Sequence, residues 1–169
     1  MKEIQLDKGM VARVDDEDFE FLSRYEWIAR PFGNNRPIYY AVCNSFNGPN
    51  NRVLMHRVLM PNPPDGCNTD HIDRDGLNNQ KNNLRYANRY QQRWNQAKRE
   101  GSQTQYIGVR LQKDRQDKLA RPWQARVRSD GKTISLGYYA TQEEAALARD
   151  SYVAVHRAGY AVLNFPPSD

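Results

Sequence analysis

Two runs of alternating side chains near the C-terminus constrain the fold more than any other feature of the chain. In residues 123–128 (Trp-Gln-Ala-Arg-Val-Arg) every second side chain is apolar, which is the period of a strand with one buried face. Residues 133–139 form a second run, and the Ser-Asp-Gly-Lys at 129–132 is typical of a hairpin turn. Residues 106–111 predict a third strand. We therefore expect a three-stranded antiparallel sheet.

A helix is expected to cover the apolar face of this sheet. Thr141 and Glu144 form a T-x-x-E capping box, helix-forming residues follow, and Gly159 stands where a C-terminal cap belongs. Three strands and a helix make a two-layer module, which we place at residues 106–166. Alternation puts Ile107 beside Val109 on the covered side. The other face should carry four polar side chains: Arg110, Gln124, Arg126 and Arg128.

The rest of the chain predicts short strands, turns and short helices, so the expected class is α+β. Residues 1–6 and 10–14 read as a hairpin, and four acidic residues at 15–18 open a short helix. After a proline-rich break, two short strands at 69–73 and 84–87 precede a helix at 89–98, with Asn88 as its N-cap. The predicted organisation is a domain at 1–97 (β-rich 1–51, core 52–97), a linker at 98–105 and the module at 106–166.

The charge distribution favours a nucleic-acid partner. The net charge is only +5, but residues 76–99 contain no acidic side chain and six basic ones. Such a stripe is typical of a surface that binds phosphates, although a solvated helix face has the same pattern. The two cysteines form no CxxC, and no apolar run reaches the ~20 residues of a membrane span. We therefore expect a cytoplasmic protein without a membrane partner.

Asp70-His71 on one short strand and Asn83 at the start of the next suggest phosphodiester hydrolysis. That reaction needs a base for water, a divalent cation at the phosphate and stabilisation of the leaving oxygen. An imidazole can be the base and a carboxylate can hold the metal. An amide on the returning strand can orient the imidazole or shape the site.

These residues, with Asn78-Asn79 and Asn82-Asn83-Leu84-Arg85, resemble the HNH endonucleases of phage and mobile introns. The resemblance spans about residues 52–95 and implies a ββα-metal fold around one Mg²⁺ or Mn²⁺ ion. It implies that His71 is the general base, that Asp70 ligates the metal and that Asn83 supports the site. The helix ligand falls on Gln92, where the family usually has His or Asn, and Asn95 is the alternative. Phosphate contacts are expected from Arg57, Arg85, Arg89 and Arg93.

The module at 106–166 resembles the AP2/ERF DNA-binding domain. The matching segments are Tyr-Ile-Gly-Val-Arg at 106–110, Trp-Gln-Ala-Arg-Val-Arg at 123–128 and Leu-Gly-Tyr-Tyr-Ala-Thr at 136–141. The family lays its sheet in the major groove, which implies DNA contacts by Arg110 and Arg128. Arg126 and Ile107 depart from the plant pattern, so no sequence preference carries over.

Together the two resemblances imply a homing-type endonuclease that nicks double-stranded DNA in a bacterial or phage-infected cell, acting as a monomer or weak dimer. Two alternatives remain. The first is a catalytically inactive DNA-binding regulator, which the Gln at position 92 favours. The second is an RNA-directed protein, which a major-groove sheet reader disfavours.

Overall fold

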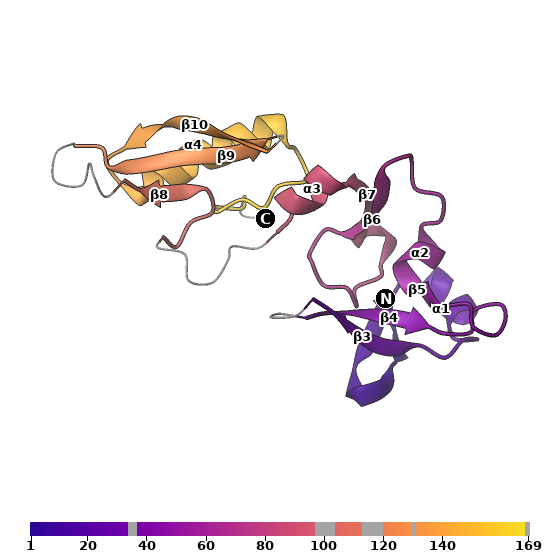
Figure 1. The fold of residues 1–169 in the computed structure, drawn as a ribbon. Helices are drawn as coiled ribbons and strands as arrows, with labels where there is room; N and C mark the ends of the chain where they lie inside the picture. Colours follow the sequence, from indigo (N-terminus) through magenta and orange to yellow (C-terminus); the bar gives the residue numbers. More distant parts are fainter. Residues whose placement is uncertain (34–36, 97–103, 113–119, 130, 168–169) are drawn as a thin grey trace. The chain divides into compact units, whose positions relative to one another are not determined.

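The chain folds into two compact units, Met1–Arg89 (unit 1) and Tyr90–Asp169 (unit 2). A computed structural model describes residues 1–33, 37–96, 104–112, 120–129 and 131–167 (Figure 1). Over these ranges the protein is α+β, with small antiparallel sheets and four α-helices. No helix in these ranges combines the length and apolar character needed to cross a membrane. The unit boundary falls at the start of a helix, earlier than the linker expected at 98–105, of which residues 98–103 lie outside the described ranges.

Unit 1 opens with the predicted hairpin and short helix. Strands β1 (Lys2–Gln5) and β2 (Val11–Val14) pair antiparallel around a 3-10 turn, and helix α1 (Asp16–Leu22) follows. Its three first-turn acids, Asp16, Glu17 and Asp18, lie at the positive end of the helix. The hairpin and α1 supply one side of the core of this unit, including Val14 and Leu22, which are fully buried.

A second sheet completes that core. Strands β3 (Ile28–Phe32), β4 (Ile38–Cys43) and β5 (Val53–Leu54) pair in that order, and helix α2 (Met55–Leu59) follows β5 directly. Residues 52–60 were expected only to continue an apolar pattern, and they divide into a two-residue strand and a one-turn helix. Met55 begins that helix and is fully buried, which fixes α2 against the sheet.

The third sheet of unit 1 is a hairpin of β6 (Cys67–His71) and β7 (Leu84–Asn88). The strand expected at 69–73 ends two residues earlier, because from Ile72 onward side-chain hydrogen bonds shape a loop. Asn88, the expected N-cap, stands directly before helix α3, which begins at Arg89. Asn88 is the last residue of β7 and pairs with Cys67.

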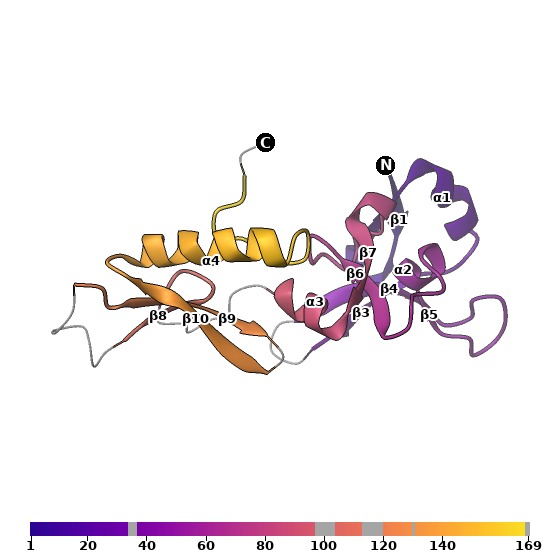
Figure 2. The same cartoon turned by 90° about the horizontal axis from the view of Figure 1, so that it is seen from above.

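Unit 2 is built on the predicted three-stranded sheet, in the order β10-β9-β8, with a helix along one face (Figure 2). Its strands are β8 (Val109–Leu111), β9 (Trp123–Ser129) and β10 (Lys132–Tyr139), and its long helix is α4 (Gln142–His156). The capping box forms as expected: Glu144 N donates to Thr141 Oγ1 at 3.1 Å. Small side chains on α4, Ala145 and Ala146, pack on Val109 and Ala125 of the sheet.

The strand predicted at 106–111 is shorter than expected. It begins at Val109, so the alternation assigned to Tyr106 and Ile107 is wrong. The Ile107 N–H donates to Asn164 Oδ1 at 2.6 Å rather than to a strand partner. Gly108 has φ +77, and a Cβ there would meet Arg126 O at 2.6 Å, so the chain turns closely over β9 at this point.

Helix α3 (Arg89–Trp94) is shorter than the helix expected at 89–98, whose end at 98 is outside the described residues. Arg89 belongs to unit 1 and the rest of α3 to unit 2. Within unit 2, Trp94 O accepts from Val162 N at 3.3 Å, and the Arg157 guanidinium lies 4.5 Å from the Trp94 ring centroid. These contacts tie the end of α3 to the segment after α4.

Candidate catalytic site

The candidate base His71 is the last residue of β6, where the hairpin opens into the loop 72–83. It stands opposite Leu84 in the register, and Ile72 N donates to Asn83 O at 2.8 Å immediately beyond it. Its side chain is buried, with 4% of its surface exposed. Strand pairing therefore fixes the backbone of His71, and the residues packed around its buried side chain fix the ring.

Asn83 shapes this loop through hydrogen bonds to Asp73 and Asn78. Its Nδ2 donates to Asp73 Oδ1 at 2.9 Å and to Asn78 O at 2.8 Å. Its Oδ1 accepts the Asp73 backbone N–H at 3.0 Å. Of the two roles expected for Asn83, orienting His71 or shaping the site, these bonds give it the second. Asp73 Oδ1 also accepts from Asp75 N at 2.8 Å, so the two aspartates help to shape the turn.

The residue that meets the imidazole is Asn79, which was not among the expected site residues. His71 Nε2 lies 3.3 Å from Asn79 Oδ1, and Asn79 is fully buried. A carbonyl oxygen accepts a proton but cannot donate one, so Nε2 is the protonated nitrogen and Nδ1 carries the lone pair. Asn79 Nδ2 has no hydrogen-bond partner among the described residues. The Asn79 side chain is therefore held by its contact with the His71 ring and by the position of the Asn79 backbone.

The N-terminal hairpin holds Asn79 in that place, which gives the first 50 residues a role that the sequence left open. Asn79 N donates to Arg13 O at 2.7 Å, and Arg13 N donates to Leu77 O at 2.8 Å. The Asp15 carboxylate accepts from Gln80 Nε2 at 3.2 Å and from Lys81 N at 2.8 Å. β2 and the start of α1 therefore hold the loop backbone on both sides of Asn79.

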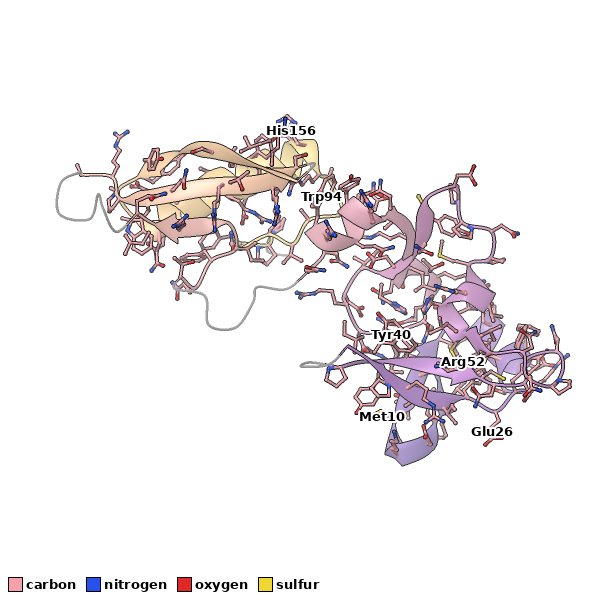
Figure 3. All side chains as sticks on the ribbon, in the orientation of Figure 1. Met10, Glu26, Tyr40, Arg52, Trp94 and His156 are labelled. Atoms are coloured by element: carbon pink, nitrogen blue, oxygen red, sulfur yellow. The ribbon has the colours of Figure 1, made fainter. Side chains whose placement is uncertain are left out.

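Aromatic rings enclose His71 on other sides. The Tyr40 ring lies 5.6 Å from His71 and 5.5 Å from His56, and the two imidazoles are 4.9 Å apart, edge to face. Gly76 makes the close approach of Tyr40 possible, since a Cβ there would meet the Tyr40 ring at 2.7 Å. Figure 3 shows Tyr40 on β4 beside this region. The His56 side chain is buried, which favours a structural role for it rather than a contact with phosphate.

Burial keeps both histidines neutral near pH 7. Desolvation, followed by the nearby His71 and Arg57 charges, lowers the pKa of His56 from 6.5 to about 3. Desolvation also lowers the pKa of His71, although Asn79 and nearby aspartates oppose this shift. A neutral imidazole with its lone pair on Nδ1 has the protonation state that a general base requires.

Asp70, the expected metal ligand, forms an ion pair with Arg85, an expected phosphate contact. Arg85 stands directly opposite Asp70 in the hairpin, and its Nε and Nη2 donate to Asp70 Oδ2 at 3.1 and 3.0 Å. Both side chains are largely covered, with 13% of Arg85 and 17% of Asp70 exposed. The guanidinium and a divalent cation would therefore compete for Oδ2.

The donor types fit Mg²⁺ or Mn²⁺, because carboxylate and amide oxygens are hard ligands. From unit 1, Asp70 would hold the ion. Gln92 and Asn95, the two alternatives for the helix ligand, belong to unit 2, where Gln92 is half-buried and Asn95 is 7% exposed. The described residues contain no cluster of three or more His, Cys, Asp or Glu that could hold a metal.

The sheet of unit 2 presents the four expected polar side chains on the face away from its core. In β9, Ala125 and Val127 are buried, whereas Arg126 is half-buried and Arg128 exposed. Arg110 on β8 is exposed and stands opposite Gln124. Gln124 is held by its neighbours: its Oε1 accepts from Gln112 at 2.8 Å and its Nε2 donates to Ser135 at 2.9 Å.

Basic side chains also line a cavity of about 660 Å³ within unit 2. Among the residues that the structure describes, its lining includes no acidic residue and five arginines: Arg93, Arg126, Arg128, Arg149 and Arg157. Two of these are internal, since Arg149 pairs with Asp150 at 2.8 Å and Arg157 donates to Arg128 O at 2.7 Å. The expected phosphate contact Arg93 is exposed on α3, and Arg57 is exposed on α2 of unit 1.

Comparisons of the chain with models of known protein families, with curated proteins and with solved structures find no match.

Proposed function

We propose that this protein is a metal-dependent endonuclease of the HNH type that nicks double-stranded DNA. The observation that carries the proposal is the state of His71 at the end of β6. Its side chain is buried, its Nε2 lies 3.3 Å from Asn79 Oδ1, and it follows Asp70 in the chain. This combination provides a base and an acidic metal ligand on adjacent residues.

In the proposed reaction, His71 Nδ1 accepts a proton from a water molecule while the water oxygen attacks the phosphorus. The bond from phosphorus to the 3′ oxygen breaks, and that oxygen takes a proton from solvent, which leaves a 3′ hydroxyl and a 5′ phosphate. When bound, the divalent ion stabilises the charge on the phosphate and on the departing oxygen. Asn79 keeps the proton of His71 on Nε2, so that the base stays on Nδ1.

Unit 2 supplies binding rather than chemistry in this proposal. A sheet face with the exposed Arg110 and Arg128 and the half-buried Arg126 suits the phosphates and base edges of a DNA groove, as in the AP2/ERF family that it resembles. A homing-type enzyme needs such a module, because one catalytic site on its own selects no target. The major-groove geometry favours duplex DNA over A-form RNA.

One observation favours a second function, a DNA-binding regulator without catalysis. The Asp70 carboxylate accepts two hydrogen bonds from Arg85, and both side chains are largely buried. If Asp70 kept Arg85 as its partner when the protein bound DNA, the Asp70 carboxylate would bind no metal. The two functions share the DNA-binding surface and differ only in cleavage.

A plasmid assay separates them. Supercoiled DNA is incubated with the full chain in Mg²⁺, Mn²⁺ or EDTA, and open-circle product is measured for the wild type and for His71→Ala. We expect metal-dependent nicking that the substitution abolishes. Nicking by His71→Ala, or intact DNA bound by the wild type in both metals, would refute the endonuclease.

Two controls make a negative result interpretable. His71 is buried, so His71→Gln, which keeps polar atoms in the ring's place, is tested beside the alanine variant. His156 lies at the end of α4 in unit 2 (Figure 3), and His156→Ala is expected to nick like the wild type. The NMR signal of the Trp27 indole N–H, which donates to Leu22 O in the core of unit 1, shows that unit 1 of each His71 variant is folded.

A further inference from the structure

An aromatic groove in unit 1 lies outside the catalytic site proposed above. Its volume is about 810 Å³, and α1, β3, α2 and the segment 46–54 border it. Three phenylalanines supply its aromatic part: Phe21, Phe32 and Phe46. We call this feature the phenylalanine groove. Its polar lining consists of Asn47, Asn51, Arg52 and Arg57.

The phenyl rings of this groove are both exposed and supported from beneath. Phe21 and Phe32 keep 42% and 43% of their surface exposed. Phe46 packs 6.2 Å from Phe21 and 6.3 Å from the buried Trp27, so the groove rests on the core of unit 1. Exposed rings on a rigid base are the feature on which unpaired bases stack in proteins that bind single strands.

The charge of the phenylalanine groove suits the same ligand. Arg52 and Arg57 are exposed, neither forms an ion pair within the described part of the chain, and no acidic residue lines the groove. Guanidinium groups bind phosphates and also stack on bases. Apolar rings between two cations match the alternation of bases and phosphates along one DNA strand.

The phenylalanine groove lies close to the candidate base. Arg57 follows His56 on α2, and His56 packs against His71. A second set of contacts leads from the groove to His71. The Phe32 ring lies 5.2 Å from the Tyr40 ring, and the Tyr40 ring lies 5.6 Å from the His71 ring. The two ring contacts therefore join the groove to the surroundings of His71 through a single intervening residue. A nucleotide in the groove would thus lie near a phosphate at His71.

We propose that the phenylalanine groove binds an unstacked base of a DNA strand that is locally single-stranded near the cleavage position. The unstacked base packs against the rings of Phe21 and Phe32, and Arg52 and Arg57 bind the neighbouring phosphates. The inference rests on the proposed endonuclease for its biological purpose, but binding itself requires neither metal nor cleavage.

The test measures binding of labelled dT20 by fluorescence anisotropy, with the full chain in EDTA so that no metal-dependent cleavage occurs. Phe21→Ala and Phe32→Ala are each expected to weaken binding about tenfold, which is typical of the loss of one base–ring stack. Leu147→Ala removes an equally exposed apolar side chain from α4 in unit 2 and should leave binding unchanged. The affinity for a fully paired 20-mer should fall less than the affinity for dT20 in both phenylalanine variants.

Salt titration separates stacking from charge. Arg52→Gln and Arg57→Gln should each reduce the slope of log K against log salt by about 0.7, the value for one phosphate of a single strand. The phenylalanine variants should keep the wild-type slope. Arg24→Gln is the matched control, because Arg24 is exposed in unit 1 but pairs with Glu20 and does not line the groove.

Unchanged dT20 binding in both phenylalanine variants would overturn the inference, whether or not the plasmid is nicked. So would sedimentation showing that wild-type chains associate through this face and that Phe32→Ala abolishes the association, because the occupant would then be a second copy. Conversely, stacking-dependent binding by a protein that nicks no plasmid would uphold the groove and reject the endonuclease.

Discussion

His56 should make unit 1 acid-sensitive by a calculable amount. Its side chain is 6% exposed and packs between Tyr40 and His71, and burial lowers its pKa from 6.5 to about 3. Between these two values the unfolded chain carries a proton on His56 that the folded chain does not. Stability therefore rises with pH through this window and falls as the solution is acidified below 6.5.

The size of the effect follows from the shift. One pKa unit corresponds to about 1.4 kcal/mol, so acidification from pH 7.5 to 5 should remove about 2 kcal/mol through His56 alone. That is a large part of the ~5–15 kcal/mol that stabilises an ordinary domain. The lowered pKa of His71 acts in the same direction and adds to the loss.

Urea unfolding at pH 7.5 and pH 5 measures this effect. The Trp27 indole N–H donates to Leu22 O at 2.8 Å inside the core, so its NMR signal reports on unit 1 alone. In His56→Phe, which keeps a ring against Tyr40, the loss on acidification should be about 2 kcal/mol smaller than in the wild type. An equal loss in the two proteins, or an equal rescue by His156→Phe, would refute the reasoning.

Three further substitutions test other parts of the structure. Gly76→Ala forces a Cβ against the Tyr40 ring and should destabilise unit 1 by about 1–3 kcal/mol in urea unfolding; unchanged stability would contradict that contact. Asn79→Ala should slow plasmid nicking at least about tenfold, as loss of a group that orients a catalytic residue does, while DNA affinity stays within about twofold; a parallel loss of affinity would make Asn79 merely structural. Thr141→Ala should cost about 1 kcal/mol in thermal unfolding of unit 2, and Ser151→Ala should not.

Local pattern was enough to predict most of unit 2. Alternation in 123–128 and the Thr141–Glu144 capping box depend on neighbours in the chain, and the structure has both. The alternation expected in 133–139 is wrong, because the register of β10 shifts between Ser135 and Gly137 and Ile134 is exposed. The strand at 106–111 was predicted too long because Asn164, more than 50 residues away, accepts from the Ile107 N–H. A partner so distant leaves no periodic signal in the strand itself.

The candidate site was predictable in its residue types but not in its contacts. Asp70, His71 and Asn83 do meet at the end of one hairpin. The sequence offers several asparagines between 78 and 83, and nothing local shows that Asn79 is the one that reaches His71. That choice depends on β2, whose Arg13 backbone holds the loop from 60 residues upstream. Helix α2 escaped prediction because five residues are too few to show a helical period.

The central claim is hydrolysis of the P–O3′ bond with His71 as the base. The most direct measurement is the number of nicks per plasmid that DNA ligase can reseal after incubation with the protein and Mg²⁺. We predict resealable nicks, each with a 3′ hydroxyl and a 5′ phosphate, that require the metal and disappear in His71→Ala. Nicks that persist in His71→Ala or resist ligase, or bound DNA that stays intact in Mg²⁺ and in Mn²⁺, would contradict the claim.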